Sequence, residues 1–327
     1  LKSLKELYHP RNEVLERNIF CSWYFYGPEV TEQDILDNLV ELQKKPLPLD
    51  VIQIDMGWDT AYGAWLANEK FPHGMEFLAK KIREAGFVPG IWTCPFIIQP
   101  DADILNRYPD IRLKNHQGQY SIFKCIRGNC FIVDPFAESA QDYFKELFGR
   151  LKSQGFTYHK LDFLRAVFIN EDSAFADRGK NRAEAYRHGL QMIRNILGEE
   201  CIINACGGLF EGSTGLCDIN RSGADNRGHW EGLGQHIASY KVRIKQNISR
   251  NFYNYLWRSD PDALQLRRRS EAWKNSPKKH LSIGLFNDDE AFSTVVNQFL
   301  GGGIACISEN LAELCADRRE LYWRLMP

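Results

Sequence analysis

The sequence has almost no net charge and no long hydrophobic run. Lys and Arg number 41 and Asp and Glu 42, which gives a formal net charge of −1. A chain without a global electric field has no long-range attraction for nucleic acid or an anionic membrane. The longest apolar stretch, from Phe87 to Phe96, is broken by Pro and Gly and is shorter than the roughly 18–20 residues of a membrane span. We therefore expect no nucleic-acid partner and no membrane partner.

The sequence also lacks the residue spacings that are typical of metal-binding and phosphate-binding motifs. The chain contains no CxxC, CxxH or HExxH motif, which argues against a zinc site. It contains no GxGxxG or GxxxxGK[ST] loop either. The nine cysteines are an odd number spread widely, and only Cys125 and Cys130 are close. This pattern does not indicate a disulfide scaffold, and it favours a reducing compartment and thus a cytoplasmic location.

What is present is an ordinary globular composition. The 327 residues are 44% hydrophobic and 25% charged, enough to bury a sizeable core. No Pro-, Gly- or Ser-rich linker divides the chain, so we expect a single domain over residues 1–327. The chain begins Leu-Lys-Ser, without Met or an apolar leader, so we expect the native N-terminus to be missing.

Short apolar runs alternate with amphipathic helices along the chain. The pattern predicts eight strands, at Phe20–Tyr24, Asp50–Ile54, Phe87–Trp92, Tyr158–Phe163, Cys201–Ala205, Asp218–Asn220, Phe252–Trp257 and Ile304–Ile307. It predicts helices at Met75–Ala85, Phe136–Gln154 and Arg182–Leu197, and a further helix opened by the capping-box-like Thr31-Glu-Gln-Asp34. Eight such units favour a (β/α)8 TIM barrel. A doubly wound sheet is the alternative.

Polar and aromatic residues follow most of these predicted strands. They are Trp23, Tyr24, Asp55, Trp92, Lys160, Asp162, Cys206, Arg221, Asp225, Trp257, Asp260 and Asp262. The carboxyl ends of barrel strands carry the active site. Flat aromatic faces, cations and several carboxylates suit a sugar, whose glycosidic bond two opposed carboxylates can cleave.

Lys160-Leu-Asp162 is the sharpest local feature. Alternation in a strand places Lys160 and Asp162 on one face, where the ammonium would hold the carboxylate ionised as a nucleophile requires. A structural salt bridge at the barrel rim fits the same pattern. Asp225 lies in a glycine-containing loop after Arg221, where a general acid or an ordinary turn residue could stand.

The remaining residues also have plain structural readings. Asp55 could cap a helix, Trp23 and Trp92 could be core aromatics, and Cys206 could be a small buried hydrophobe. Arg267-Arg-Arg269 is a short charged turn, which is more often solvated surface than a nucleic-acid patch.

At these residues the chain resembles the melibiase-type α-galactosidases of glycoside hydrolase family 36. The matching stretches are Ser22-Trp-Tyr24, Gln53-Ile-Asp-Met-Gly-Trp58, Trp65 with Lys70-Phe-Pro72, Gly90-Ile-Trp-Thr-Cys-Pro95, Lys160-Leu-Asp-Phe163, Cys206-Gly-Gly208, Arg221-Ser-Gly-Ala-Asp225 and Trp257-Arg-Ser-Asp-Pro-Asp262. They occur in the family's order, from about residue 20 to about 310, and eight ordered motifs are specific where one would not be.

The resemblance implies a catalytic barrel and a retaining double displacement without metal or organic cofactor. Asp162 matches the nucleophile and Asp225 the general acid/base, whose carboxyl groups would lie about 5–5.5 Å apart. The resemblance implies that Lys160, Arg221 and Asp55 bind sugar hydroxyls. It also implies that the walls of the pocket are formed by Trp23, Tyr24, Trp65 and Trp92. Cys206 would be a small residue in the pocket, and Asp262 would support the site from behind.

Met56 departs from the family pattern, which has a second Asp there. That acid helps to recognise the axial 4-hydroxyl of galactose, and a thioether cannot accept a strong hydrogen bond. The expected activity is hydrolysis of terminal α-linked galactose. An enzyme for another α-linked sugar, or a transglycosylase like raffinose synthase, is the alternative. A non-catalytic sugar-binding barrel is a third reading, against which the presence of both Asp162 and Asp225 argues.

The resemblance also bears on the partners. An oligosaccharide or glycoconjugate is the expected substrate. Family members commonly carry flanking β-domains that this chain lacks, and the N-terminal one can complete the pocket across an oligomer. A homo-oligomer is therefore a further expectation.

Overall fold

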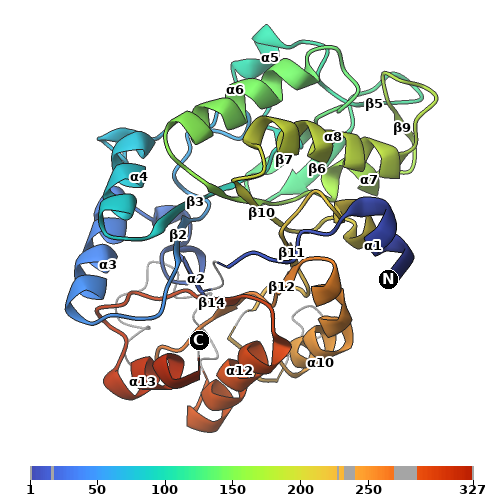
Figure 1. Cartoon of the computed structure of the whole chain (residues 1–327). Helices are drawn as coiled ribbons and strands as arrows, with labels where there is room; N and C mark the ends of the chain where they lie inside the picture. Colours follow the sequence, from blue (N-terminus) through green and yellow to red (C-terminus); the bar gives the residue numbers. More distant parts are fainter. Residues whose placement is uncertain (1, 16–17, 227, 232–239, 269–285, 326–327) are drawn as a thin grey trace.

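The computed structural model describes residues 2–15, 18–226, 228–231, 240–268 and 286–325 (Figure 1). Parallel strands gather at its centre and helices surround them. The strands of the central sheet are β1 (Asn18–Cys21), β2 (Val51–Ile54), β3 (Val88–Thr93), β8 (Tyr158–Leu161), β10 (Ile202–Ala205), β11 (Ile219–Arg221), β12 (Arg258–Asp260), β13 (Ala263–Leu264) and β14 (Ala305–Ile307). Most of their residues are buried, as expected when a parallel sheet is covered on both faces.

The sheet closes on itself through its seventh strand, which is split in two. β12 pairs with β11 and β13 pairs with β14, and only Pro261 and Asp262 separate the two halves. β14 in turn pairs with β1. A split strand that binds both neighbours completes a ring of eight, so the predicted (β/α)8 barrel is confirmed.

Helices and short elements surround this ring. The helices are α1 (Lys2–Tyr8), α2 (Trp23–Tyr26), α3 (Glu32–Lys44), α4 (Gly74–Glu84), α5 (Ile104–Arg107), α6 (Ala140–Ser153), α7 (Ala166–Ile169), α8 (Arg182–Leu197), α9 (Phe210–Ser213), α10 (Tyr240–Arg250), α12 (Asp288–Gly301) and α13 (Ala316–Leu325), with 3-10 turns η1 (Gly27–Glu29) and η2 (Asn251–Tyr255). The capping box predicted at Thr31 and Asp34 opens α3, since each side chain accepts from the other residue's backbone N–H.

A hairpin is inserted between β3 and β8. Its strands β6 (Ile122–Cys125) and β7 (Gly128–Ile132) pair with each other, and β7 also pairs with β4 (Ile97–Ile98). A second small sheet joins β5 (Lys114–Asn115) to β9 (Ser173–Ala174). No sequence pattern predicted these additions, and the hairpin lies at the candidate site.

Three local predictions were wrong. The first strand, predicted at Phe20–Tyr24, ends at Cys21, and the chain turns into helix α2 from Trp23. The run 252–257, expected to be the seventh strand, forms η2 and the approach to β12, because Tyr253 and Trp257 stack at a centroid distance of 5.1 Å across helical spacing. Arg267, expected in a solvated turn, is 1% exposed and pairs with the buried Glu309. Arg269 lies outside the described residues.

Among the described residues no helix is both long and apolar enough to span a bilayer. The same residues contain no cluster of three or more His, Cys, Asp or Glu side chains arranged to hold a metal ion.

Candidate active site at the carboxyl ends of the strands

A cavity of about 550 Å³ opens at the carboxyl ends of the barrel strands. The predicted site residues that line it are Trp23, Tyr24, Asp55, Trp92, Lys160, Asp162, Cys206, Arg221, Asp225 and Asp262. Met56, Cys125, Ile126, Phe163, Arg165, Gly207, Gly223 and Ala224 complete the lining. Residues more than 200 positions apart thus meet in one hollow, because parallel strands deliver their last residues to the same edge.

Asp162 follows β8 and is held by neutral donors. The indole Nε1 of Trp92 donates to its Oδ2 at 3.1 Å, and the backbone N–H of Phe163 donates to its Oδ1 at 2.7 Å. Phe163 has a φ of 50°, a left-handed conformation unusual for a bulky residue. The chain therefore turns sharply after β8 and presents a half-buried, oriented carboxylate to the cavity.

Lys160 and Asp162 both line the cavity, but the ion pair of Lys160 is with Asp55. The Lys160 Nζ lies 2.9 Å from Asp55 Oδ2, and both side chains are buried. Burial opposes the charged ammonium, but the attraction of Asp55 outweighs it and holds the pKa of Lys160 well above its usual value. The expected Lys160–Asp162 pairing is thus corrected: the indole and the backbone amide, rather than the ammonium, hydrogen-bond to Asp162.

Asp55 is anchored on several sides. Its Oδ2 also accepts from Gln53 Nε2 at 2.7 Å, and its Oδ1 accepts from the backbone N–H of Met56 at 2.9 Å. Its own backbone N–H donates to Ser22 Oγ at 2.9 Å. The result is a rigid anionic group, 2% exposed, in the cavity floor.

Arg221 ends β11 and lies among three carboxylates. Its guanidinium approaches Asp262 at 3.0 Å, Asp260 at 3.3 Å and Asp225 at 3.3 Å. Asp260 was expected at the strand ends, but the sequence assigned it no role in the site. Burial would raise the pKa of Asp260, but the Arg221 cation outweighs it and lowers that pKa.

Asp262 stands at the break in the seventh strand, with a φ of 73°. It accepts hydrogen bonds from the Tyr24 hydroxyl and from the backbone N–H of Asn226. Burial, reinforced by the nearby Asp225 and Asp260, raises its pKa. Burial, with the negative charges of Asp225 and Asp262 close by, keeps the pKa of Tyr24 well above its usual value, so Tyr24 stays a neutral donor. Asp262 both supports Arg221 and Tyr24 and borders the cavity.

Asp225 differs from the other acids in its exposure. Its side chain is 55% exposed, whereas those of Asp55, Asp260 and Asp262 are at most 5% exposed. It therefore lies at the rim, where a group bound in the cavity would meet solvent.

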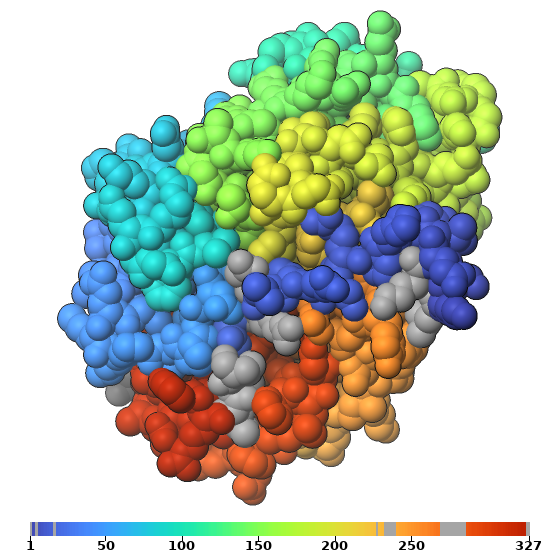
Figure 2. Space-filling view, in the orientation of Figure 1, coloured from blue at the N-terminus to red at the C-terminus, as the bar shows by residue number. Residues whose placement is uncertain are grey.

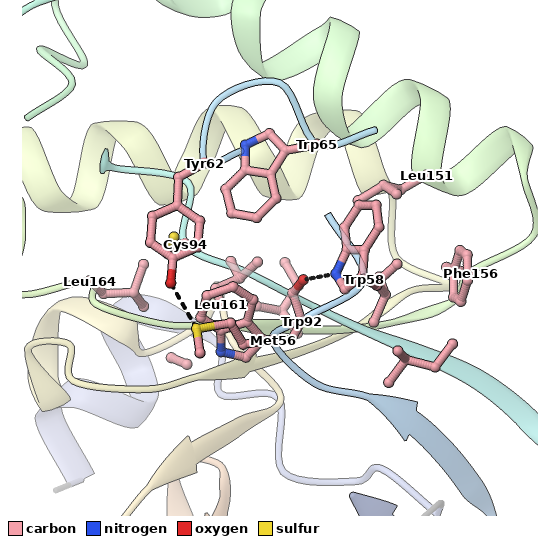
Figure 3. Packing of buried hydrophobic residues seen from close by; sticks show 14 of the residues in the cluster. Met56, Trp58, Tyr62, Trp65, Trp92, Cys94, Leu151, Phe156, Leu161 and Leu164 are labelled. Carbon is pink, nitrogen blue, oxygen red and sulfur yellow. Dashed lines mark hydrogen bonds between the residues drawn. The ribbon is translucent and has the colours of Figure 1, made fainter. Parts of the chain in front are cut away.

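The aromatic wall behind the cavity is shown in Figure 3. The Tyr62 hydroxyl donates to the Met56 sulfur at 2.7 Å, and Trp58 Nε1 donates to the Trp92 carbonyl at 2.9 Å. Trp65, predicted as a pocket wall, does not line the cavity. It is 1% exposed and packs behind Trp92, with a centroid distance of 6.1 Å between the two rings. Its aromatic surface is used in the core instead.

Cys206 lines the cavity after β10 and is 7% exposed. Burial, with the negative charge of Asp162 close by, holds the pKa of its thiol well above the usual value. A neutral, small side chain at this position widens the hollow without adding charge.

Comparison with known proteins places this geometry in a family. Residues 19–284 match the model of the glycosyl hydrolases family 31 TIM-barrel domain. The chain is 27% identical over 183 residues to α-galactosidase AgaA of Geobacillus stearothermophilus, and 27% identical over 193 residues to α-galactosidase Mel36A of Lactobacillus acidophilus. These alignments cover 50% and 56% of this chain but only 24% and 25% of the relatives, so the chain matches about a quarter of their length.

Solved structures share the fold over nearly the whole chain. An α-galactosidase of Thermus thermophilus, solved in complex with stachyose, superposes with a TM-score of 0.83 at 23% identity, covering 100% of this chain and 69% of its own. The GH36 α-galactosidase AgaA superposes with a TM-score of 0.65 at 15% identity, covering 94% of this chain and 41% of its own. The family match spans most of the chain and includes every strand up to β13, so this chain belongs to the glycosyl hydrolases family 31 TIM-barrel domain family.

Proposed function

We propose that this barrel hydrolyses terminal α-linked galactose by a retaining double displacement, as the family-36 resemblance implies. The observation that carries the proposal is that Asp162 and Asp225 line one sugar-sized cavity in different surroundings. Asp162 is half-buried and oriented by two hydrogen-bond donors, as a nucleophile must be. Asp225 lies at the exposed rim, where a leaving group would depart. The α-galactosidase names of the relatives support the sugar.

The proposed chemistry needs two steps. In the first, an Asp162 oxygen attacks the anomeric carbon while Asp225 gives its proton to the departing oxygen, which leaves a covalent glycosyl-enzyme. In the second, Asp225 takes a proton from water, and that water displaces Asp162 with a second inversion. The buried Asp55 and Lys160 would bind hydroxyls at the floor, and Trp23 and Trp92 would bound the ring. These groups perform the chemistry without a metal or organic cofactor.

Azide separates the two proposed roles. In Asp162→Ala, azide should attack the substrate directly and give the β-galactosyl azide, because only one inversion occurs. In Asp225→Ala, with an aryl galactoside that needs no acid, azide should attack the glycosyl-enzyme and give the α-galactosyl azide. NMR of the products distinguishes the two anomers.

The exposed Asp142 on α6 provides the control, since Asp142→Ala should leave turnover unchanged. If Asp162→Ala keeps its activity, or if either variant forms the opposite anomer, the assignment is wrong.

Met56 supports a second candidate, an enzyme for another α-linked sugar or a transglycosylase. Met56 lines the cavity, its sulfur accepts from the Tyr62 hydroxyl, and the side chain offers no carboxylate for a sugar hydroxyl. A panel of nitrophenyl α-glycosides decides between the candidates. Hydrolysis of the galactoside alone would remove the second one, and transfer to an added sugar acceptor would favour the transglycosylase.

The organisation of residues 1–327 as one catalytic barrel is part of the proposal, as is assembly into a homo-oligomer. Mass measurement of the native protein in solution tests the oligomer.

A further inference from the structure

The cavity has a buried floor and an exposed rim. Asp55, Lys160 and Asp262 in the floor are at most 6% exposed. Ile126 at the rim is 62% exposed, and Arg165 is exposed as well. Because the rim also carries Asp225, a sugar whose leaving oxygen meets Asp225 would direct the rest of the substrate toward these exposed residues.

Ile126 forms the tip of the inserted hairpin between β6 and β7. Its side chain is exposed to solvent and also lines the cavity. Here the side chain offers an apolar surface of the kind that packs on the C–H face of a sugar ring.

Arg165 follows β8, and its guanidinium packs against the same hairpin. Its guanidinium carbon lies 5.2 Å from the ring centroid of Phe123 and 5.5 Å from that of Phe163. A methyl group placed on Gly207 would come within 3.3 Å of its Nη1, so the guanidinium lies against the cavity lining. Within the described part of the chain the Arg165 guanidinium has no hydrogen bond or ion pair, although the backbone carbonyl of Arg165 accepts from the N–H of Phe168. Its donors therefore remain available to a ligand.

A buried ion pair holds the hairpin in place. Next to Ile126, Arg127 donates to both carboxylate oxygens of Asp59, at 2.5 and 3.2 Å, and the Asp59 side chain is fully buried. The Arg127 guanidinium also covers the Tyr62 ring at 4.4 Å, and Tyr62 in turn donates to Met56. Bidentate pairing fixes direction as well as distance. The hairpin tip is thus tied to the cavity wall.

We propose that Ile126 and Arg165 bind the leaving group, that this group is a second sugar, and that Arg127 is the residue positioning Ile126. Ile126 packs on the ring face and Arg165 donates to hydroxyls. The inference rests on the proposed function, since it assigns the leaving-group side of that same site.

The test compares an α-galactosyl disaccharide with α-galactosyl fluoride, whose leaving group is too small to reach the rim. Ile126→Ser and Arg165→Met should each lower kcat/KM for the disaccharide about 10-fold and change it for the fluoride less than about 2-fold. Arg127→Met should raise KM for the disaccharide more than it lowers kcat, and Arg127→Lys should recover part of that loss.

Matched controls are available outside the cavity. Ile169→Ser removes an isoleucine that is 49% exposed at the end of α7, and Arg112→Met removes a guanidinium that covers Tyr120 at 4.1 Å. Neither substitution should change kcat/KM for the disaccharide or for the fluoride. Equal losses on disaccharide and fluoride, or no loss on the disaccharide, would overturn the proposal.

Binding measurements keep this inference separate from the proposed function. If the wild-type protein cleaves neither substrate, the proposed hydrolysis fails. Calorimetry then compares the disaccharide with galactose. If the disaccharide binds more tightly than galactose, and Arg165→Met removes that difference, the second-sugar site is supported. Equal affinities for the disaccharide and galactose would overturn it.

Discussion

Single side chains in the cavity are specialised by what surrounds them. Asp162 receives an indole N–H, Asp55 pairs with an ammonium, and the exposed Asp225 pairs with a guanidinium. Three identical carboxyl groups thus differ in orientation and exposure. That indole and that ammonium come from residues far away in the chain, whereas the partner of Asp225 is Arg221, four residues before it. Each contact is testable by removing a single donor.

Trp92→Phe should weaken catalysis through Asp162. The substitution keeps an aromatic surface but removes the N–H that donates to Asp162. A hydrogen bond to a charged group contributes about 1.5–3 kcal/mol, so kcat should fall about 10- to 100-fold. Steady-state kinetics on an aryl galactoside measures this, with Trp323→Phe on the exposed face of α13 as control. An unchanged kcat would mean that the indole does not orient the nucleophile.

Cys125 should be the reactive cysteine at the cavity. Its sulfur lies 3.6 Å from that of Cys130, and hydrogen bonding from Cys130, opposed by burial, lowers the pKa of Cys125 to about 7. Because the thiolate is the nucleophile, alkylation by iodoacetamide should speed up as the pH rises through about 7. Peptide mapping should find the label at Cys125, and galactose should slow its attachment. Labelling unaffected by pH or by the sugar would contradict this, and Cys125→Ser is the control.

At the scale of elements, helix α8 is defined by residues at its own ends. Asn181 opens α8 as a capping box with Glu184, and Gly198 closes it with a φ of 78°. The inserted hairpin and the split seventh strand instead take their places from partners elsewhere in the barrel.

Asn181→Ala should destabilise the protein without touching the site. The Asn181 side chain accepts from the backbone N–H groups of Ala183 and Glu184, at 2.9 and 3.0 Å. Loss of such a cap costs about 1 kcal/mol of unfolding free energy. Urea titration should show that loss, while kcat/KM stays at the wild-type value. A large drop in activity would show that α8 transmits its stability to the cavity.

At the scale of the whole molecule, one end of the barrel is covered and the other carries the cavity. Residues 2–15 lie across the face seen in Figure 2. Arg11 pairs there with Asp218, which precedes β11, at 2.7 Å, and Asp218 also pairs with the buried Arg194. The N-terminal segment therefore closes the end of the barrel away from the candidate active site.

Acid should destabilise the barrel through His159, which is fully buried in β8. Burial lowers the pKa of His159 to about 3, against an ordinary value of 6.5. As pH falls below about 6.5, His159 becomes protonated in the unfolded chain. In the folded chain it stays neutral until about pH 3. His159 therefore costs about 1.4 kcal/mol of unfolding free energy per pH unit across that window.

Urea titration of wild type and His159→Asn from pH 7 to pH 4.5 measures the effect. The variant should lose stability less steeply with falling pH, whatever its stability at pH 7. Parallel slopes would contradict the assignment. His9, exposed on the N-terminal segment, provides the control substitution.

Much of the fold followed from local patterns. Apolar runs ending in polar residues marked seven of the eight strands, and Thr31 and Gly198 marked helix ends. The failure at 252–257 is instructive. Aromatic residues suit strands and stacked helical turns alike, and in the fold Tyr253 stacks on Trp257 and packs against Phe210.

The sequence by itself determined the barrel and the set of polar residues at its strand ends, because strand alternation and helix periodicity are properties of neighbouring residues. The tertiary structure alone decided that Lys160 pairs with Asp55, that Trp65 packs behind the wall, and that a hairpin brings Ile126 to the rim. Those outcomes depend on distances between residues remote in the chain. Charge and burial select among such partners only after the strands have closed into a ring.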